Sequence, residues 1–162
     1  MPDRARQLLG DKLALLLAEI RRLPGFAPLS RVSVALYDAH DDILRTFSSA
    51  NLDYDPLDEY EVRLSTVPSL AVLASGGTGV RIVDDLANYG SASANHTAAL
   101  RTAGLRSSMT VPIGTADTFL GFVFFNAAEV GFFTPDRVRL LEPFTMSILK
   151  MVAKDFVRAV AV

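Results

Sequence analysis

The strand-like segments of this chain lie too close together in the sequence to be joined by crossover helices. Val32 to Tyr37 alternates apolar and polar residues, and a second alternating stretch, Ile43 to Ala50, follows after the turn Asp38 to Asp42. Connections this short favour antiparallel neighbours, so the two segments predict a β-hairpin. Met109 to Ile113 and Phe119 to Phe125 predict a second hairpin for the same reason.

Helical patterns stand at both ends of the chain. An amphipathic helix is expected from Asp3 to Leu23, and a final helix begins after Thr134, which caps it, with Pro135 in its first turn. Pro143 falls inside the final helix, so we expect a bend there. The remaining expected elements are strands at Tyr60–Leu64 and Val80–Val83, a small helix ending at Gly76 and a helix over His96–Ala103. This order predicts an α+β domain around an antiparallel sheet.

Both terminal helices carry more apolar surface than one sheet face needs. Apolar residues of the first helix recur at alternating spacings of four and three, the a/d pattern of a helical seam, and the last helix has two apolar stripes. We therefore expect both helices to contact the helices of a second copy in a homodimer. The expected dimer residues are Leu9, Leu13, Leu16, Ile20 and Leu23 in the first helix and Leu141, Ile148 and Val152 in the last, with Leu8 and Leu15 beside the first seam and Leu140, Phe144 and Met151 as the second stripe.

Composition narrows the classes of function. The chain has 162 residues, enough for one domain with its own core, and a net charge of -2 with no cluster of basic residues, so nucleic acid is not an expected partner. It has no cysteine, which excludes disulfides, thiolate metal sites, thioether-linked cofactors and a cysteine nucleophile. Its apolar runs are shorter than the ~20 residues of a membrane span. We expect a soluble cytoplasmic domain that has no membrane contact.

Three local patterns resemble the GAF domain family, a family of sensory and regulatory domains in bacterial signalling proteins. Val80–Leu86 is similar to the family's strand that ends in an acidic pair. The stretch from His96 to Pro112 is similar to the segment that leads from the pocket helix into a central strand. Leu120–Asn126, followed by Phe133–Asp136, is similar to the family's final hairpin and helix entry.

The resemblance implies a PAS-related fold with an antiparallel sheet of about five to six strands. The N- and C-terminal helices would cover one face, while small helices and loops would enclose a ligand pocket on the other. It divides the chain into an amphipathic helix at residues 1–28, serving the dimer and the core, and the GAF domain with its C-terminal helix at residues 29–162.

Subtypes of the family can be compared residue by residue. His96, Asp84 and Ser108 resemble the pocket residues of phytochrome-type domains, but covalent attachment of a bilin is excluded because the chain has no cysteine. The motif of cyclic-nucleotide domains is incomplete, since Ala127 stands where that motif has a lysine. Reduction of methionine sulfoxide, as carried out by relatives with catalytic cysteines, is excluded for the same lack of thiols.

The candidate pocket residues are His96, Asp84, Ser108, Phe47, Tyr60 and Tyr89. Each has an ordinary alternative: a first-turn histidine, a strand-ending carboxylate, or core and loop packing. A multi-histidine metal site is not expected because His40, in a turn, is the only other histidine. No nucleophile, base pair or metal cluster marks an active site, so no catalytic residue is assigned.

These observations favour a non-catalytic sensory domain that binds an unidentified small molecule, dimerises, and controls an effector domain such as a kinase, phosphodiesterase, cyclase or transcription activator. Two alternatives stay open: a pure dimerisation scaffold with a collapsed pocket, and a sensor that holds haem or another tetrapyrrole non-covalently. The sequence names no cofactor.

Overall fold

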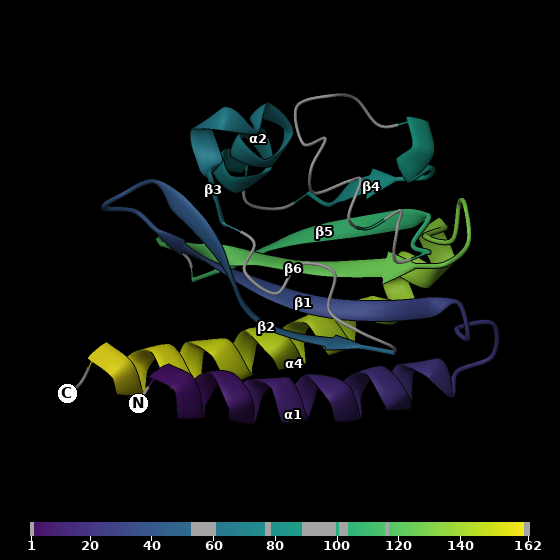
Figure 1. The fold of residues 1–162 in the computed structure, drawn as a ribbon, viewed down its shortest axis with the longest axis horizontal. Helices are drawn as coiled ribbons and strands as arrows, with labels where there is room; N and C mark the ends of the chain where they lie inside the picture. Colours follow the sequence, from purple (N-terminus) through teal and green to yellow (C-terminus); the bar gives the residue numbers. More distant parts are fainter. Residues whose placement is uncertain are drawn as a thin grey trace.

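A computed structural model shows a sheet with a layer of two long helices on one face and small helices on the other (Figure 1). The structure describes residues 2–52, 61–76, 79–88, 100, 104–115 and 117–160. The elements are α1 (Pro2–Arg21), β1 (Leu29–Asp38), β2 (Ile43–Asn51), β3 (Glu61–Arg63), η1 (Leu64–Thr66), α2 (Pro68–Gly76), β4 (Arg81–Val83), η2 (Leu86–Asn88), β5 (Ser107–Gly114), β6 (Phe119–Ala127) and α4 (Pro135–Val160). Apart from Leu100, the expected helix over His96–Ala103 lies outside the described residues.

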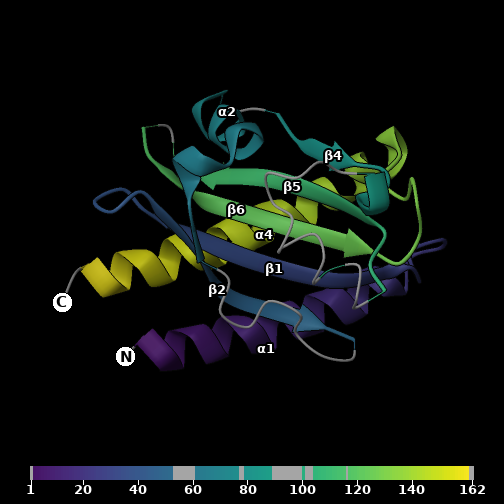
Figure 2. The same cartoon turned by 45° about the horizontal axis from the view of Figure 1, so that its top comes forward.

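The sheet has six strands in the order β3-β2-β1-β6-β5-β4, and every neighbouring pair is antiparallel (Figure 2). Both predicted hairpins form, β1 with β2 and β5 with β6. The first and last hairpins also pair with each other through β1 and β6, so the two central strands come from opposite halves of the chain. The predicted α+β class and antiparallel sheet are confirmed.

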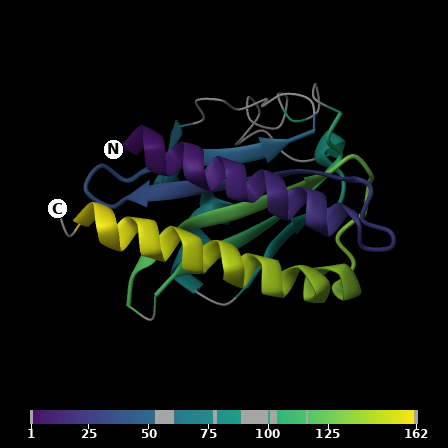
Figure 3. The same ribbon diagram turned by 90° about the horizontal axis from the view of Figure 1, so that it is seen from below.

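The helical layer consists of α1 and α4, which lie side by side and run in opposite directions beneath the sheet (Figure 3). The main core fills the space between these helices and the sheet. On the sheet side it holds Val32, Val34, Val123, Phe125 and Met109. Because residues two apart on a strand share a face, these positions define the helix side of β1, β6 and β5.

The residues expected to form a dimer seam lie inside this core, which corrects their sequence assignment. Leu9, Leu13, Leu16, Ile20, Leu141, Ile148 and Val152 are all buried within a single chain, and Leu23 is partly buried against the same cluster. The spacing of four and three between the apolar residues of α1 therefore arises from packing against the chain's own sheet. A helix that covers a sheet and a helix that pairs with another helix use the same period, so the pattern could not separate them.

The start of α4 is the one that the sequence predicts. Thr134 Oγ1 accepts the backbone N–H of Arg137 at 3.4 Å, and Pro135 is the first helical residue, as predicted. The helix then continues through Pro143 as one element. Pro143 is exposed on this helix.

A smaller core lies on the opposite face, which we call the loop side. Here α2 and η1 cover the sheet with Leu64, Val67 and Leu70, which pack against Leu44 and Phe122. Both covering elements are short, with three residues in η1 and nine in α2. No described helix combines the length and apolar content that a membrane crossing needs.

Replacement of Gly121 by alanine is expected to destabilise the fold strongly. Gly121 of β6 pairs with Leu36 of the neighbouring strand β1, and a Cβ at Gly121 would stand 2.0 Å from the carbonyl oxygen of Ala35. One strand would have to move, at a cost of about 3 kcal/mol in the free energy of unfolding, measured by urea denaturation. Gly76→Ala is the matched control, because no atom lies within 4 Å of its Cβ position. Equal stability of the two variants would show that β1 and β6 are not held this closely.

Candidate functional site

Polar side chains gather on the loop side of the four strands β1, β6, β5 and β4. The strand register sets them in two rows across the sheet. The first row is Arg31, Asn126, Ser108 and Val83, and the second is Ser33, Phe124, Thr110 and Arg81. We call these eight residues, of which all but Val83 and Phe124 are polar, the polar face.

Most of the polar face is buried. Arg31 is 1% exposed, Asn126 2% and Ser108 4%, although each belongs to a residue type that usually lies at the surface. Burial of such groups is costly unless they are hydrogen-bonded, so a row of them in the middle of a sheet has to be justified by their bonds or by a ligand.

Arg31 links β1 and β6 on the polar face through side-chain hydrogen bonds. Its Nη1 donates to Ser33 Oγ at 2.8 Å and to Asn126 Oδ1 at 3.4 Å. Arginine suits this position because its planar guanidinium offers five N–H donors in a fixed fork. The same bonds hold the Asn126 amide in one orientation beside Ser108.

Arg81 occupies the opposite corner and links the sheet to α2. Its Nη1 donates to Ser69 Oγ at 2.8 Å and its Nη2 to Thr110 Oγ1 at 3.3 Å. Arg81 is only partly buried, whereas Thr110 is fully buried. The polar face therefore carries one inner and one outer guanidinium, with hydroxyl and amide groups between them.

Of the six predicted pocket residues, the structure places one, Ser108, on the polar face. Ser108 lies in its first row. Asp84 is exposed just beyond β4, where its backbone carbonyl accepts the N–H of Gly131 at 2.8 Å. His96, Tyr60 and Tyr89 lie outside the described residues.

Phe47 is on the other side of the sheet, which corrects its assignment to the pocket. An irregularity in register between Val34 and Ala35 leaves Phe47 between the paired residues of β2. Its ring packs against the main core and lies 5.5 Å from the guanidinium of Arg6 in α1. The extra residue of such a bulge changes the face to which neighbouring side chains point, and strict alternation could not foresee it.

Apart from Ser108, no residue of the polar face was identified as a pocket residue from the sequence. Arg31, Asn126, Thr110 and Arg81 each interrupt or border an apolar strand pattern, and Asn126 was noted only in the incomplete cyclic-nucleotide motif. The one sequence feature that could have pointed to this face was Arg31, a charged residue directly before the alternating stretch that begins with Val32. Sequence pattern alone would read such a residue as solvent-exposed.

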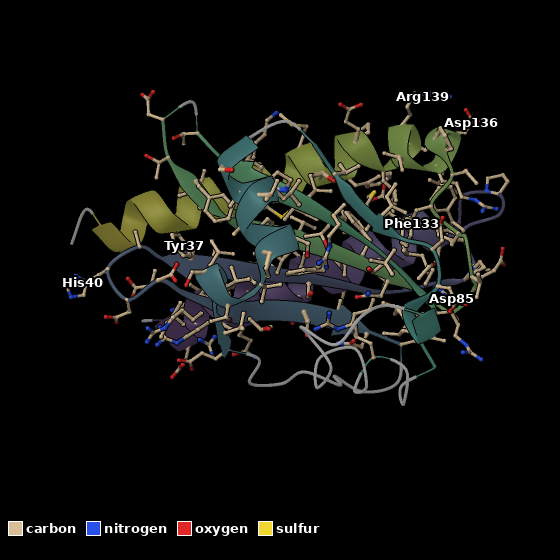
Figure 4. The ribbon with its side chains drawn as sticks, turned by 90° about the horizontal axis from the view of Figure 1, so that it is seen from above. Tyr37, His40, Asp85, Phe133, Asp136 and Arg139 are labelled. Atoms are coloured by element: carbon tan, nitrogen blue, oxygen red, sulfur yellow. The ribbon has the colours of Figure 1, made fainter. Side chains whose placement is uncertain are left out.

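Among the described residues, the titratable groups labelled in Figure 4 lie in two groups at the two ends of the sheet. In Figure 4, His40 at the hairpin tip and Asp85 beyond β4 lie at opposite ends of the sheet. Within the described parts of the chain, no three His, Asp or Glu side chains form a group that could hold a metal ion. What the face offers is hydrogen bonding, from two arginines, two serines, a threonine and an asparagine.

The β1–β2 turn is joined to the small helices through Asp42. Tyr37 donates its hydroxyl to Asp42 Oδ1 at 2.8 Å, and the Ser65 N–H donates to Asp42 Oδ2 at 3.2 Å. The backbone of Asp42 has φ 57°, a left-handed conformation that Asp tolerates better than most residues. Hydrogen bonding from Ser65, and then from Tyr37, lowers the pKa of Asp42 below its usual 3.8. These bonds fix the position of η1 and α2 over the loop side.

Comparison with known proteins gives a fold and no closer relationship. No family model matches the chain, and no curated protein matches it. Among solved structures, the phycocyanobilin-bound GAF domain of a cyanobacterial phytochrome is similar with a TM-score of 0.65 and 19% identity, over 96% of this chain and 91% of that one. A GAF domain/HD domain protein from Geobacter sulfurreducens has a TM-score of 0.69 and 14% identity, over 93% and 92%.

The same fold also occurs in an enzyme. A type II free methionine-R-sulfoxide reductase from Thermoplasma acidophilum is similar with a TM-score of 0.63 and 9% identity, over 93% of this chain and 96% of that one. Identities this low establish the fold alone. The chain has the GAF-domain fold, and its function has to be argued from its own residues.

Replacement of Asp42 by asparagine is expected to lower the thermal midpoint at neutral pH, because the ionised carboxylate accepts from both Tyr37 and Ser65. A lowered native pKa means that this stabilisation is present above the unfolded-state pKa of about 3.8 and is lost as pH falls through the lower native pKa. The difference between wild type and Asp42→Asn should therefore shrink below about pH 4. Thermal unfolding from pH 7 to pH 3 measures it, with the exposed neighbour Asp41→Asn as control. A constant difference across this range would contradict the assigned role of the carboxylate.

Proposed function

We propose that this chain is a non-catalytic sensory domain of a signalling protein. A small molecule binds at the polar face and changes the packing of the helical layer. That layer forms a homodimer and passes the change to an effector domain. Such a relay works only if the ligand binds one arrangement of the helices more tightly than the other.

The buried polar face carries this proposal. Its arginines, hydroxyls and amide occupy the sheet face away from the long helices, beside the apolar surface of Phe122 and Phe124. Small-molecule sites usually combine an apolar wall with a few fixed polar groups, and this face has both. The bilin-bound GAF domain among the similar structures is a case of this fold with a ligand.

A route from the polar face to the helices runs through β5. Ser108 and Thr110 point to the loop side, while Met109, Val111 and Ile113 point to the helix side. These three residues form one wall of a groove of 320 Å³, and Val138, Thr145 and Leu149 of α4 form the other. This groove lies between the strand that carries Ser108 and the helix that would respond, so the proposed relay runs through these two elements.

The dimer surface that we propose is the valley between α1 and α4. Arg6 and Gly10 lie on the side of α1 that contacts β2. Leu8 and Leu15 are about half a turn away from these two residues around the helix axis, so they lie on the opposite side of α1, toward α4. On α4, the stripe facing α1 is opposite the residues that line the groove. We call the set Leu8, Leu15, Leu140, Phe144 and Met151 the outer strip; the first three are 48%, 74% and 53% exposed. Two copies joined through this strip would form a four-helix bundle.

Native mass spectrometry of the purified chain tests ligand retention and dimerisation together. The proposal predicts a dimer whose mass exceeds twice the denatured mass by that of a retained small molecule, or a dimer that gains such mass on incubation with a cell extract. A bare dimer under both conditions would favour the pure scaffold. A monomer would contradict the dimer relay.

Replacement of Leu15 by glutamate is expected to convert the dimer to a monomer while leaving the fold intact. Leu15 is 74% exposed, so the charge costs the single chain little but would be buried between two copies. We expect the dimer dissociation constant to rise by at least about 100-fold, measured by analytical ultracentrifugation. Val72→Glu is the matched control, because Val72 is 71% exposed on α2 and outside the strip. Equal weakening by both changes would place the interface elsewhere.

A further inference from the structure

The helical layer is narrower than the sheet that it covers. Two helices side by side span about 20 Å, whereas six strands at spacings of about 4.8 Å span about 24 Å. α1 contacts β1 and β2 and α4 contacts β5, so the uncovered part includes the edge strand β4. Ile82 pairs with Met109 on the helix side, and Val80, two residues before Ile82, shares that face. Ile82 and Val80 are 37% and 41% exposed, so the helix side of the sheet stays open beside α4.

The groove between β5 and α4 lies at this opening and has apolar walls. Met109 and Ile113 form its buried floor, and Val80 and Met146 are exposed on its two sides. The remaining apolar residues that line it are Val111, Pro112, Val138 and Leu149. Single exposed apolar side chains are ordinary, but apolar side chains gathered around a hollow are typical of a binding site.

Three polar side chains also line the groove, and they differ in whether they have a partner. Thr145 donates its hydroxyl to the carbonyl oxygen of Leu141 at 3.3 Å, so this group is already satisfied within the helix. Arg139 forms an ion pair with Asp136, and both lie at the start of α4 (Figure 4). No described residue forms an ion pair with the exposed carboxylate of Glu142. The rim of the groove therefore carries one uncompensated negative charge.

The groove suits a small apolar body better than it suits water. An internal water makes about two to four hydrogen bonds, and the apolar side chains of the groove offer none, so an apolar group that displaces such water gains affinity. An aliphatic cavity of about 150 Å³ holds benzene, so a groove of 320 Å³ has room for about two rings. This volume lies within the range of small-molecule sites, about 300–1,000 Å³, whereas a protein partner needs a broader surface.

We propose that the groove is a second ligand site and that it binds a small organic amine. The apolar body, of about two rings, lies between Met109 and Ile113 of β5 and Leu149 of α4, with the ammonium group at Glu142. This site is on the opposite face of the sheet from the polar face and does not depend on binding there. Because its walls are β5 and α4, its occupant contacts both elements of the proposed relay. The groove is open, so its ligand exchanges rapidly and is lost during purification.

Naphthylmethylamine, naphthylmethanol and naphthylacetate are suitable probes because they share the two-ring body and differ in charge. The full chain is labelled with carbon-13 at its methionine methyl groups and titrated with each probe. Met109 and Met146 line the groove, whereas Met151 belongs to the outer strip on the other flank of α4. We expect the Met109 and Met146 signals to move with probe concentration and the Met151 signal to stay. The Kd of the amine should be about 3-fold below that of the alcohol, with the acid weakest.

Variants of the rim test the position and the charge of the site. Val80→Arg adds a long cationic side chain beside the groove and is expected to raise the Kd of the amine at least about 10-fold. Val130→Arg is the matched control, because Val130 is 52% exposed and does not line the groove. An unchanged Met151 signal in each free variant shows that the fold is intact.

Glu142→Gln removes the charge and nearly keeps the shape of the side chain. It is expected to weaken binding of the amine about 3-fold and to leave binding of the alcohol unchanged. Glu129→Gln, at an exposed carboxylate away from the groove, is the control and should change neither.

Unmoved Met109 and Met146 signals, equal binding of the amine and the acid, or full binding by Val80→Arg would each overturn the inference. Such a failure leaves the polar face and its proposed ligand untouched. Amine binding in the groove of a chain that retains no molecule at the polar face would keep this site and remove the other.

Discussion

The pairing of β1 with β6 is the interaction on which the rest of the structure depends. It joins two hairpins from opposite halves of the chain, and Gly121 lets the strands approach more closely than any side chain would allow. Its two faces are chemically different: Val32, Val34, Val123 and Phe125 seat the long helices, whereas Arg31, Ser33 and Asn126 form the polar face. Because residues alternate along a strand, one pair of strands builds both the hydrophobic core and the candidate site.

In the proposed function, ligand recognition and output lie on opposite faces of the same sheet. A side chain that moves on the loop side of β5 displaces the same backbone that supports Met109 and Ile113 beneath α4. In the proposed relay, α4 borders the groove beside β5, and the outer strip would carry the response to a second copy. The small helices have the complementary task of holding the loop side together, through Asp42 at the hairpin and Arg81 at α2.

Regular features of the fold were predictable from the sequence, and features that depend on tertiary context were not. Alternation in Val32–Tyr37 and the Thr134-Pro135 start of α4 are local signals, and the structure confirms both. The heptad-like spacing in α1 was wrong as a dimer seam because packing on a sheet has the same period. Phe47 was misplaced because a bulge depends on pairing with another strand, and Arg31 was missed because the chain buries it with distant Asn126. Ser108 was proposed as a pocket residue through a family resemblance, because the sequence by itself gave it no distinguishing feature.

A crystal structure of the purified protein tests the division of the sheet into two faces most directly. The account predicts copies related by a two-fold axis through the Leu8, Leu15 and Leu140 strip, with any bound molecule in contact with Arg81, Ser108 or Asn126. A dimer joined through the loop side, or a molecule bound only in the groove between β5 and α4, would contradict it.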